Sequence, residues 1–183
     1  MNAITKHFRQ VEEGMTLLDD VEIAGLVSVL RFVKEGNGTV YLFGNGGSHA
    51  TASHFANDLM KMAKIKAVCV GDMASAIMAW GNDTGWENMY YGPLSEMVEP
   101  KCDALIGISC SGNSENVVRA LRAGLDQWSM LTCCLTGMSD SNMVSTLGLD
   151  AVVHVRVPDI RVQEDIHLMI CHAVVRALQE HEM

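Results

Sequence analysis

Apolar positions near the amino terminus repeat at alternating spacings of four and three residues. The repeat predicts an amphipathic helix whose apolar stripe consists of Ile4, Phe8, Val11, Met15 and Leu18. A second helical pattern covers residues 22–34 and ends at the turn Gly36-Asn37-Gly38. Residues 1–36 are therefore expected to form an N-terminal helical extension. Its stripe suits an oligomer-forming helix, although burial within one subunit would give the same pattern.

Beyond this turn, short apolar runs alternate with helical segments. The runs show no polar alternation, so they suit strands that are buried on both faces of a parallel sheet. They are Thr39–Phe43, Ala67–Val70, Ala104–Ile108, Met130–Leu135 and Ala151–Val157. We predict one α/β domain over residues 1–183, with a five-stranded parallel sheet sandwiched by helices. Ligands of such sheets bind beyond the carboxyl ends of the strands.

The loop after the first run is rich in glycine. It reads Gly44-Asn45-Gly46-Gly47-Ser48 and precedes a helix expected over residues 49–62. Glycines let the backbone approach a ligand closely, and a helix start offers free N–H groups to an anion. The alternative is a tight turn in which Ser48 serves only as the N-cap of the helix.

The loop after the third run carries three hydroxyl groups and a glycine. It reads Ser109-Cys110-Ser111-Gly112-Asn113-Ser114 and precedes a helix expected over residues 115–125. Capping that helix would need one hydroxyl, so the additional ones favour an oxyanion site. The lysine of a nucleotide-binding P-loop is missing, which weighs against nucleoside triphosphate chemistry.

The amino-acid composition of the chain limits the classes of partner that it is expected to bind. A formal net charge of −9 weighs against nucleic-acid binding, so a phosphorylated ligand would be held locally by N–H and hydroxyl donors. The six cysteines lie in apolar runs or singly, which suggests reduced thiols. No apolar run reaches the roughly 20 residues of a membrane span, and residues 1–7 lack a secretion signal. A cytoplasmic protein without membrane or nucleic-acid partners is expected.

Two helices carry polar residues at helical spacing. His54 and Asp58 are four residues apart and share one face of the helix after the first loop. The last helix, residues 161–180, is expected to bury an apolar face made of Val162, Ile166, Met169, Ala173 and Ala177. A different face of it presents Glu164, His167, Cys171 and His172. A surface ion pair and core histidines would explain each set alone, but two sets near two anion loops favour a shared site.

These motifs, in this order, resemble the SIS-domain phosphoheptose isomerases. The resemblance covers both loops, His54-Phe55-Ala56, Gly81-Asn82-Asp83, Leu135-Thr136-Gly137 and Arg156-Val157-Pro158. It implies a flavodoxin-like sheet and a homotetramer with active sites between subunits. It also implies that the sugar phosphate is held by Ser48, Ser109, Ser111 and Ser114, with Asn45 and Asp83 near the sugar hydroxyls. The backbone and side chains of Gly46, Gly47, Cys110 and Asn113 belong to the same expected binding loops.

The resemblance further implies a metal site and the catalytic groups. Family members bind zinc through a first-helix His and carboxylate and a last-helix Gln and His. The matching residues here are His54, Asp58, Glu164 and His172, with Asp in place of the usual Glu and Glu in place of the usual Gln. Two carboxylates and two imidazoles suit Zn²⁺ or another divalent ion. Proton transfer is expected from Asp58 and His172, with Glu164 as the alternative base.

The implied reaction converts sedoheptulose 7-phosphate to D-glycero-D-manno-heptose 7-phosphate through an enediol. The two departures in the ligand set leave another ketose phosphate open as substrate. Two other functions also compete. One is a non-catalytic SIS tetramer that binds a replication initiator protein, and the other is a sugar-phosphate-sensing regulatory domain. The retained His and carboxylate pairs favour an enzyme.

Overall fold

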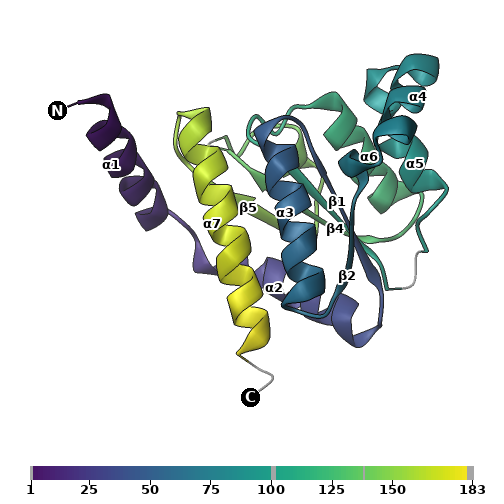
Figure 1. Cartoon of the computed structure of the whole chain (residues 1–183), viewed down its shortest axis with the longest axis horizontal. Helices are drawn as coiled ribbons and strands as arrows, with labels where there is room; N and C mark the ends of the chain where they lie inside the picture. Colours follow the sequence, from purple (N-terminus) through teal and green to yellow (C-terminus); the bar gives the residue numbers. More distant parts are fainter. Residues whose placement is uncertain (1, 100–101, 138, 181–183) are drawn as a thin grey trace.

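The computed structural model describes residues 2–99, 102–137 and 139–180, in which five strands and seven α-helices form (Figure 1). The strands are β1 (Thr39–Gly44), β2 (Lys66–Cys69), β3 (Ala104–Ser109), β4 (Leu131–Thr136) and β5 (Ala151–His154). The α-helices are α1 (Ala3–Thr16), α2 (Asp20–Glu35), α3 (Gly47–Lys61), α4 (Ala74–Thr84), α5 (Tyr91–Ser95), α6 (Glu115–Asp126) and α7 (Ile160–Gln179). Three 3₁₀ turns are η1 (Val70–Asp72), η2 (Trp86–Asn88) and η3 (Val144–Thr146).

The five strands make one parallel sheet in the order β2-β1-β3-β4-β5, which confirms the predicted fold class. All five predicted strands are present. The last one is shorter than expected, because β5 ends at His154 and the next residues lead into α7. Consecutive strands run outward in opposite directions from β1 and β3. The loops that follow these two strands therefore flank the switch point where ligands of such sheets bind.

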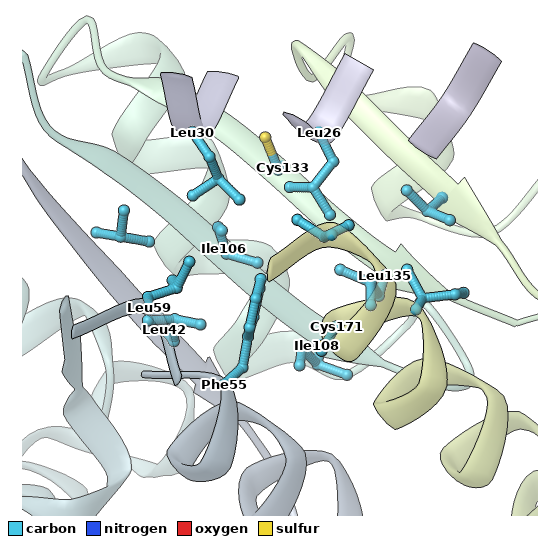
Figure 2. Packing of buried hydrophobic residues seen from close by; sticks show 14 of the residues in the cluster. Leu26, Leu30, Leu42, Phe55, Leu59, Ile106, Ile108, Cys133, Leu135 and Cys171 are labelled. Atoms are coloured by element: carbon cyan, nitrogen blue, oxygen red, sulfur yellow. The ribbon is translucent and has the colours of Figure 1, made fainter. Parts of the chain in front are cut away.

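Both faces of the sheet are buried. Leu42 packs with α2, α3 and α7, whereas the next residue, Phe43, packs with α5 and α6 on the other face. Figure 2 shows the first of these cores, where Phe55 of α3 projects toward Ile106 and Ile108 of the sheet. Burial on both faces explains why the strands read as continuous apolar runs.

The N-terminal helix α1 lies beside α7 at one edge of the molecule (Figure 1). Gly14 permits this contact, since a Cβ there would lie 2.6 Å from the Cδ1 atom of Ile166. His7 adds an ion pair to Asp165, with Nε2 and Oδ2 2.7 Å apart. Ile4 and Phe8 are 67% and 66% exposed, so the chain itself leaves much of the apolar stripe uncovered.

Among the described residues, no helix combines the length and the apolar character that a membrane span needs. The described cysteines are all free thiols, as expected. Four of them are buried, and Cys102 and Cys110 are half-buried.

Candidate functional site

The first loop turns sharply from β1 into α3. Gly46 has φ +55°, a left-handed conformation that a glycine adopts without strain. It is also the N-cap of α3 and makes no side-chain capping bond. Ser48 is therefore not the N-cap, and the tight-turn alternative is wrong in that respect. Ser48 lies in the first turn of α3, where it is 5% exposed and its hydroxyl is directed toward the second loop.

The second loop is a compact turn between β3 and α6. Gly112 has φ +64°, and its N–H donates to the Ser109 carbonyl at 2.9 Å. The Ser109 hydroxyl donates to the Ser114 hydroxyl at 3.2 Å, and the Ser111 hydroxyl accepts from the N–H of Asn113. The Asn113 side chain in turn accepts from the N–H of Met143, which attaches the loop to the segment after β4. Three hydroxyls thus gather at one strand end.

The two loops are joined by side chains. The amides of Asn45 and Asn116 form a reciprocal pair, with N–O distances of 3.0 and 2.8 Å. The Tyr90 hydroxyl donates to the carbonyl of Gly44 and lies 3.2 Å from the Asn45 side-chain oxygen. Ser48 Oγ lies 3.8 Å from Cys110 Sγ. The Asn45 amide is thus held by Asn116 and Tyr90, and side-chain contacts connect the two expected substrate loops.

Cys110 has a second neighbour, the fully buried His167. His167 Nε2 donates to the carbonyl of Thr136 at 3.0 Å, which leaves Nδ1 as the acceptor facing Cys110 Sγ at 3.9 Å. Burial lowers the pKa of His167 to about 4, so the ring is neutral at physiological pH. Burial raises the pKa of the Cys110 thiol to about 11, and the nearby Glu164 carboxylate adds to that rise.

His54, Asp58 and His172 meet where α3 lies beside α7. The two Nε2 atoms are 3.0 Å apart, and Asp58 Oδ2 lies 3.3 Å from His54 and 3.7 Å from His172. One donor atom from each residue lies within 4.8 Å of the others. Tetrahedral Zn²⁺ with Zn–N bonds of about 2.0 Å sets its nitrogens about 3.3 Å apart, so these residues fit such an ion. Three protein ligands with an open position are typical of catalytic zinc sites.

The Glu164 side chain lies beside the first loop, next to Gly47. A Cβ at Gly47 would lie 2.4 Å from the Glu164 carboxylate carbon, so this carboxylate rests on the start of α3. It is not among the donors that the structure groups with His54 and His172 in the described residues. Three of the four predicted ligands, His54, Asp58 and His172, therefore lie together, and the fourth, Glu164, lies beside the first loop.

Asp83 makes a different set of contacts from these residues. It is exposed near the end of α4, and its carboxylate accepts from the neighbouring Asn82 side chain at 2.7 Å. In the described part of the chain, no hydrogen bond or ion pair joins it to another predicted site residue.

A cleft of about 750 Å³ opens beside Asp58 and His172. It follows α7 past Met169 and Arg176 and is bordered by Met62 at the end of α3. The His54 and His172 side chains are 48% and 51% exposed. The donor cluster is therefore open to a ligand or to a neighbouring subunit.

The sequence-based face assignment on α7 needs correction. Val162 and Ile166 are buried as expected, but Met169 is 39% exposed and Ala173 is also exposed. His167 and Cys171 are buried, so they are not part of an open polar face. Helix α7 contacts both α3 and α2, so the side chains that it buries differ from those predicted. Gln163, next to Glu164, is buried and donates to the carbonyl of Val157 at 2.6 Å.

Sequence reasoning missed the residues that brace the loops. Asn116 is 0% exposed, and a polar residue in the first turn of α6 gave no sign that it would pair with Asn45. Tyr90 is 2% exposed and packs in the core, and its hydroxyl also binds the first loop, which no sequence pattern indicated. Thr136, whose hydroxyl donates to the carbonyl of Ser109 at 3.0 Å, stood inside a quoted motif but received no role.

Comparison with known proteins shows which family the chain resembles in sequence. The family model of the SIS domain matches residues 3–137. A phosphoheptose isomerase from Bordetella avium (strain 197N) is 34% identical, with 93% of this chain and 90% of the relative covered.

Solved structures agree with the sequence match. Phosphoheptose isomerase GmhA from Neisseria gonorrhoeae superposes with a TM-score of 0.86 at 27% identity, covering 96% of this chain and 94% of that one. A phosphoheptose isomerase from Francisella tularensis gives a TM-score of 0.86 at 23% identity, covering 98% and 100%, and at that identity supports the fold alone.

Proposed function

Because this chain belongs to the SIS-domain family and, within it, to the phosphoheptose isomerases, we propose that it converts sedoheptulose 7-phosphate to D-glycero-D-manno-heptose 7-phosphate. It is an aldose–ketose isomerase of sugar phosphates. The observation that carries the proposal is the meeting of Asp58 with His54 and His172 in a chain that also has two hydroxyl-bearing loops at the switch point. An adaptor without catalysis has no use for such a cluster.

The second loop and Ser48 are proposed to hold the phosphate. The hydroxyls of Ser48, Ser109, Ser111 and Ser114 are neutral donors, as a chain of net charge −9 requires. Ser48 and His54 are six residues apart, hence about 9 Å apart along α3. The loops and the donor cluster can therefore engage opposite ends of one extended sugar phosphate.

Isomerisation moves a proton between C1 and C2 through an enediol. We propose that the Asp58 carboxylate takes the proton from C1 of the ketose and that it is returned at C2. His172 then supplies a proton to the carbonyl oxygen at C2 and recovers one from the hydroxyl at C1. Asp58 is 7% exposed, so its carboxylate is largely shielded from bulk water, and both Asp58 and His172 line the cleft. Glu164 is the alternative base.

His54, Asp58 and His172 are proposed to hold Zn²⁺ or another divalent ion, with Glu164 as a further ligand. Such an ion would polarise the carbonyl of the substrate. The support is the donor set itself, because two imidazoles and a carboxylate are ligands that zinc prefers.

The site is proposed to be shared between subunits of a cytoplasmic homotetramer. Exposed apolar residues on α1 support association, and so does the cleft that leaves His172 half-exposed. Asp83 has no hydrogen bond or ion pair to the donor cluster in the described part of its own chain, and we propose that it serves the site of a neighbouring subunit. Neither nucleic acid nor membrane is proposed as a partner.

The test is incubation with sedoheptulose 7-phosphate in D₂O, with and without added Zn²⁺, followed by NMR. Formation of the aldose with deuterium at C2 would support both the substrate and the enediol route. Absence of conversion together with absence of exchange into the ketose would refute this reaction. Conversion of a different ketose phosphate would then keep the isomerase class, whereas inactivity on all of them would favour a replication-initiator-binding adaptor.

A further inference from the structure

A second group of metal-ligand side chains lies at the outer edge of the sheet. His49 is in the first turn of α3, Cys69 is the last residue of the edge strand β2, and Asp72 ends the 3₁₀ turn η1. His49 and His54 are five residues apart, so they point about 140° away from each other around α3. The His49 group therefore belongs to a different face of α3 from the cluster with His172.

The three side chains are in direct contact. His49 Nδ1 lies 3.6 Å from Cys69 Sγ, and His49 Nε2 lies 3.3 Å from Asp72 Oδ1. One donor atom of each residue lies within 4.8 Å of the other two. With Zn–S bonds of about 2.3 Å and Zn–N bonds of about 2.0 Å, tetrahedral geometry puts sulfur and nitrogen about 3.5 Å apart. The 3.6 Å between Cys69 Sγ and His49 Nδ1 is close to this sulfur–nitrogen distance.

The surroundings orient these donors. Ser53, one turn after His49 on α3, donates its hydroxyl to Asp72 Oδ2 at 2.8 Å, as partners outside a ligand set commonly do. Gly71 leaves room for the imidazole, since a Cβ there would lie 2.4 Å from His49 Nδ1. The side chains of His49 and Asp72 are 35% and 52% exposed, which gives an ion an entry path, while Cys69 is buried.

We propose that His49, Cys69 and Asp72 form a second divalent-metal site, selective for a borderline-soft ion such as Zn²⁺ and completed by solvent. The thiolate and imidazole disfavour Mg²⁺ and Ca²⁺, which prefer oxygen ligands. Burial raises the pKa of Cys69 to about 11, so the ion displaces the thiol proton, which leaves to solvent as the S–metal bond forms. The bound ion would tie β2 and η1 to the start of α3, directly after Ser48.

Co²⁺ tests this site independently of isomerase activity. The His54→Ala/His172→Ala double variant removes two donors of the other cluster, and it is titrated with Co²⁺ under reducing conditions. Thiolate ligation gives a charge-transfer absorption in the near ultraviolet that nitrogen and oxygen ligands alone do not give. We expect this band to saturate at one Co²⁺ per chain and to be removed by excess Zn²⁺.

Substitutions identify the thiolate. On the same background, Cys69→Ser should abolish the band, and His49→Ala should weaken Co²⁺ binding at least tenfold while leaving the thiol in place. Gly71→Ala should weaken it as well by displacing the ring. Cys110→Ser is the matched control, because Cys110 also lies beside a histidine, and it should keep the band. Absence of the band, its survival in Cys69→Ser, or its loss in Cys110→Ser would each overturn the proposal. Melting curves establish that every variant is folded.

Discussion

His54 and His172 stand 118 positions apart in the chain, yet their Nε2 atoms lie 3.0 Å from each other. At that distance one ring can donate its Nε2 proton to the other, or both nitrogens can bind one metal ion. The Asp58 carboxylate beside both rings favours a cation there. This one contact, made by α3 lying against α7, supplies the geometry for both the proposed metal site and the proposed proton transfer.

Replacing Asp58 by Asn tests the proposed base. Asn keeps the shape of the side chain but cannot accept the proton, so kcat should fall by roughly 10²- to 10⁴-fold. Binding of the sugar phosphate, measured by calorimetry, should change little because the loops are untouched. Asp58→Glu is the conservative control and should retain turnover. Near-normal turnover of Asp58→Asn would assign the base to another residue, with Glu164 as the first candidate.

Replacing Glu164 by Gln tests the charge beside the first loop. The Glu164 carboxylate rests on Gly47, where it would repel a phosphate bound at the first loop. Its removal should lower KM for the sugar phosphate roughly fivefold, since repulsion of this kind is worth about 1 kcal/mol in a largely solvated site. Zinc content of the same variant reports whether Glu164 is a ligand. Asp165→Asn, at the next and more exposed position, should leave KM unchanged. A large loss of kcat would instead identify Glu164 as the base.

Replacing Ser114 by Ala tests the phosphate loop. Loss of this hydroxyl removes one donor to the phosphate and the partner of Ser109, so KM should rise roughly tenfold, about 1.4 kcal/mol, with a smaller change in kcat. Ser28→Ala, on the exposed side of α2, is the control and should match the wild type. An unchanged KM would place the phosphate away from the second loop.

The buried His167 predicts a pH dependence of stability. Its pKa is about 4 in the folded protein and about 6.5 when unfolded, so the unfolded chain binds the proton first as pH falls. The stability is complete above pH 6.5 and is lost progressively toward pH 4, by about 3 kcal/mol for this group. The free energy of unfolding should fall more steeply in the wild type than in His167→Gln. Equal slopes, or an NMR titration of the ring near 6.5, would contradict the assignment.

Replacing Phe8 by Ser tests association through α1. The Phe8 ring is 66% exposed in the chain, so its loss should not unfold the monomer. If α1 forms the proposed tetramer contacts, light scattering should show a smaller assembly at micromolar concentration. Arg9→Ser places the same side chain at a neighbouring exposed position and should remain tetrameric. A monomeric wild type, or an intact Phe8→Ser tetramer, would rule out this role for Phe8.

The order of the elements and the position of both loops could be predicted from the amino-acid pattern. Strands buried on both faces must read as continuous apolar runs, and Gly-rich or Ser-rich segments at their ends mark the turns. This is why β1 and β3 were placed within one residue of their observed ends. The pairing of His54 with Asp58 was equally accessible, because four residues return a helix to the same face.

Which helix faces meet could not be predicted in this way, because it depends on how the folded chain packs. Periodicity gives the angle of a side chain around its own helix, but not which neighbour covers that angle. Met169 therefore proved exposed and His167 buried, and Glu164 came to rest on Gly47 rather than with His172. The contact of His49 with Cys69 likewise depends on β2 lying beside α3, a long-range packing that no local pattern encodes.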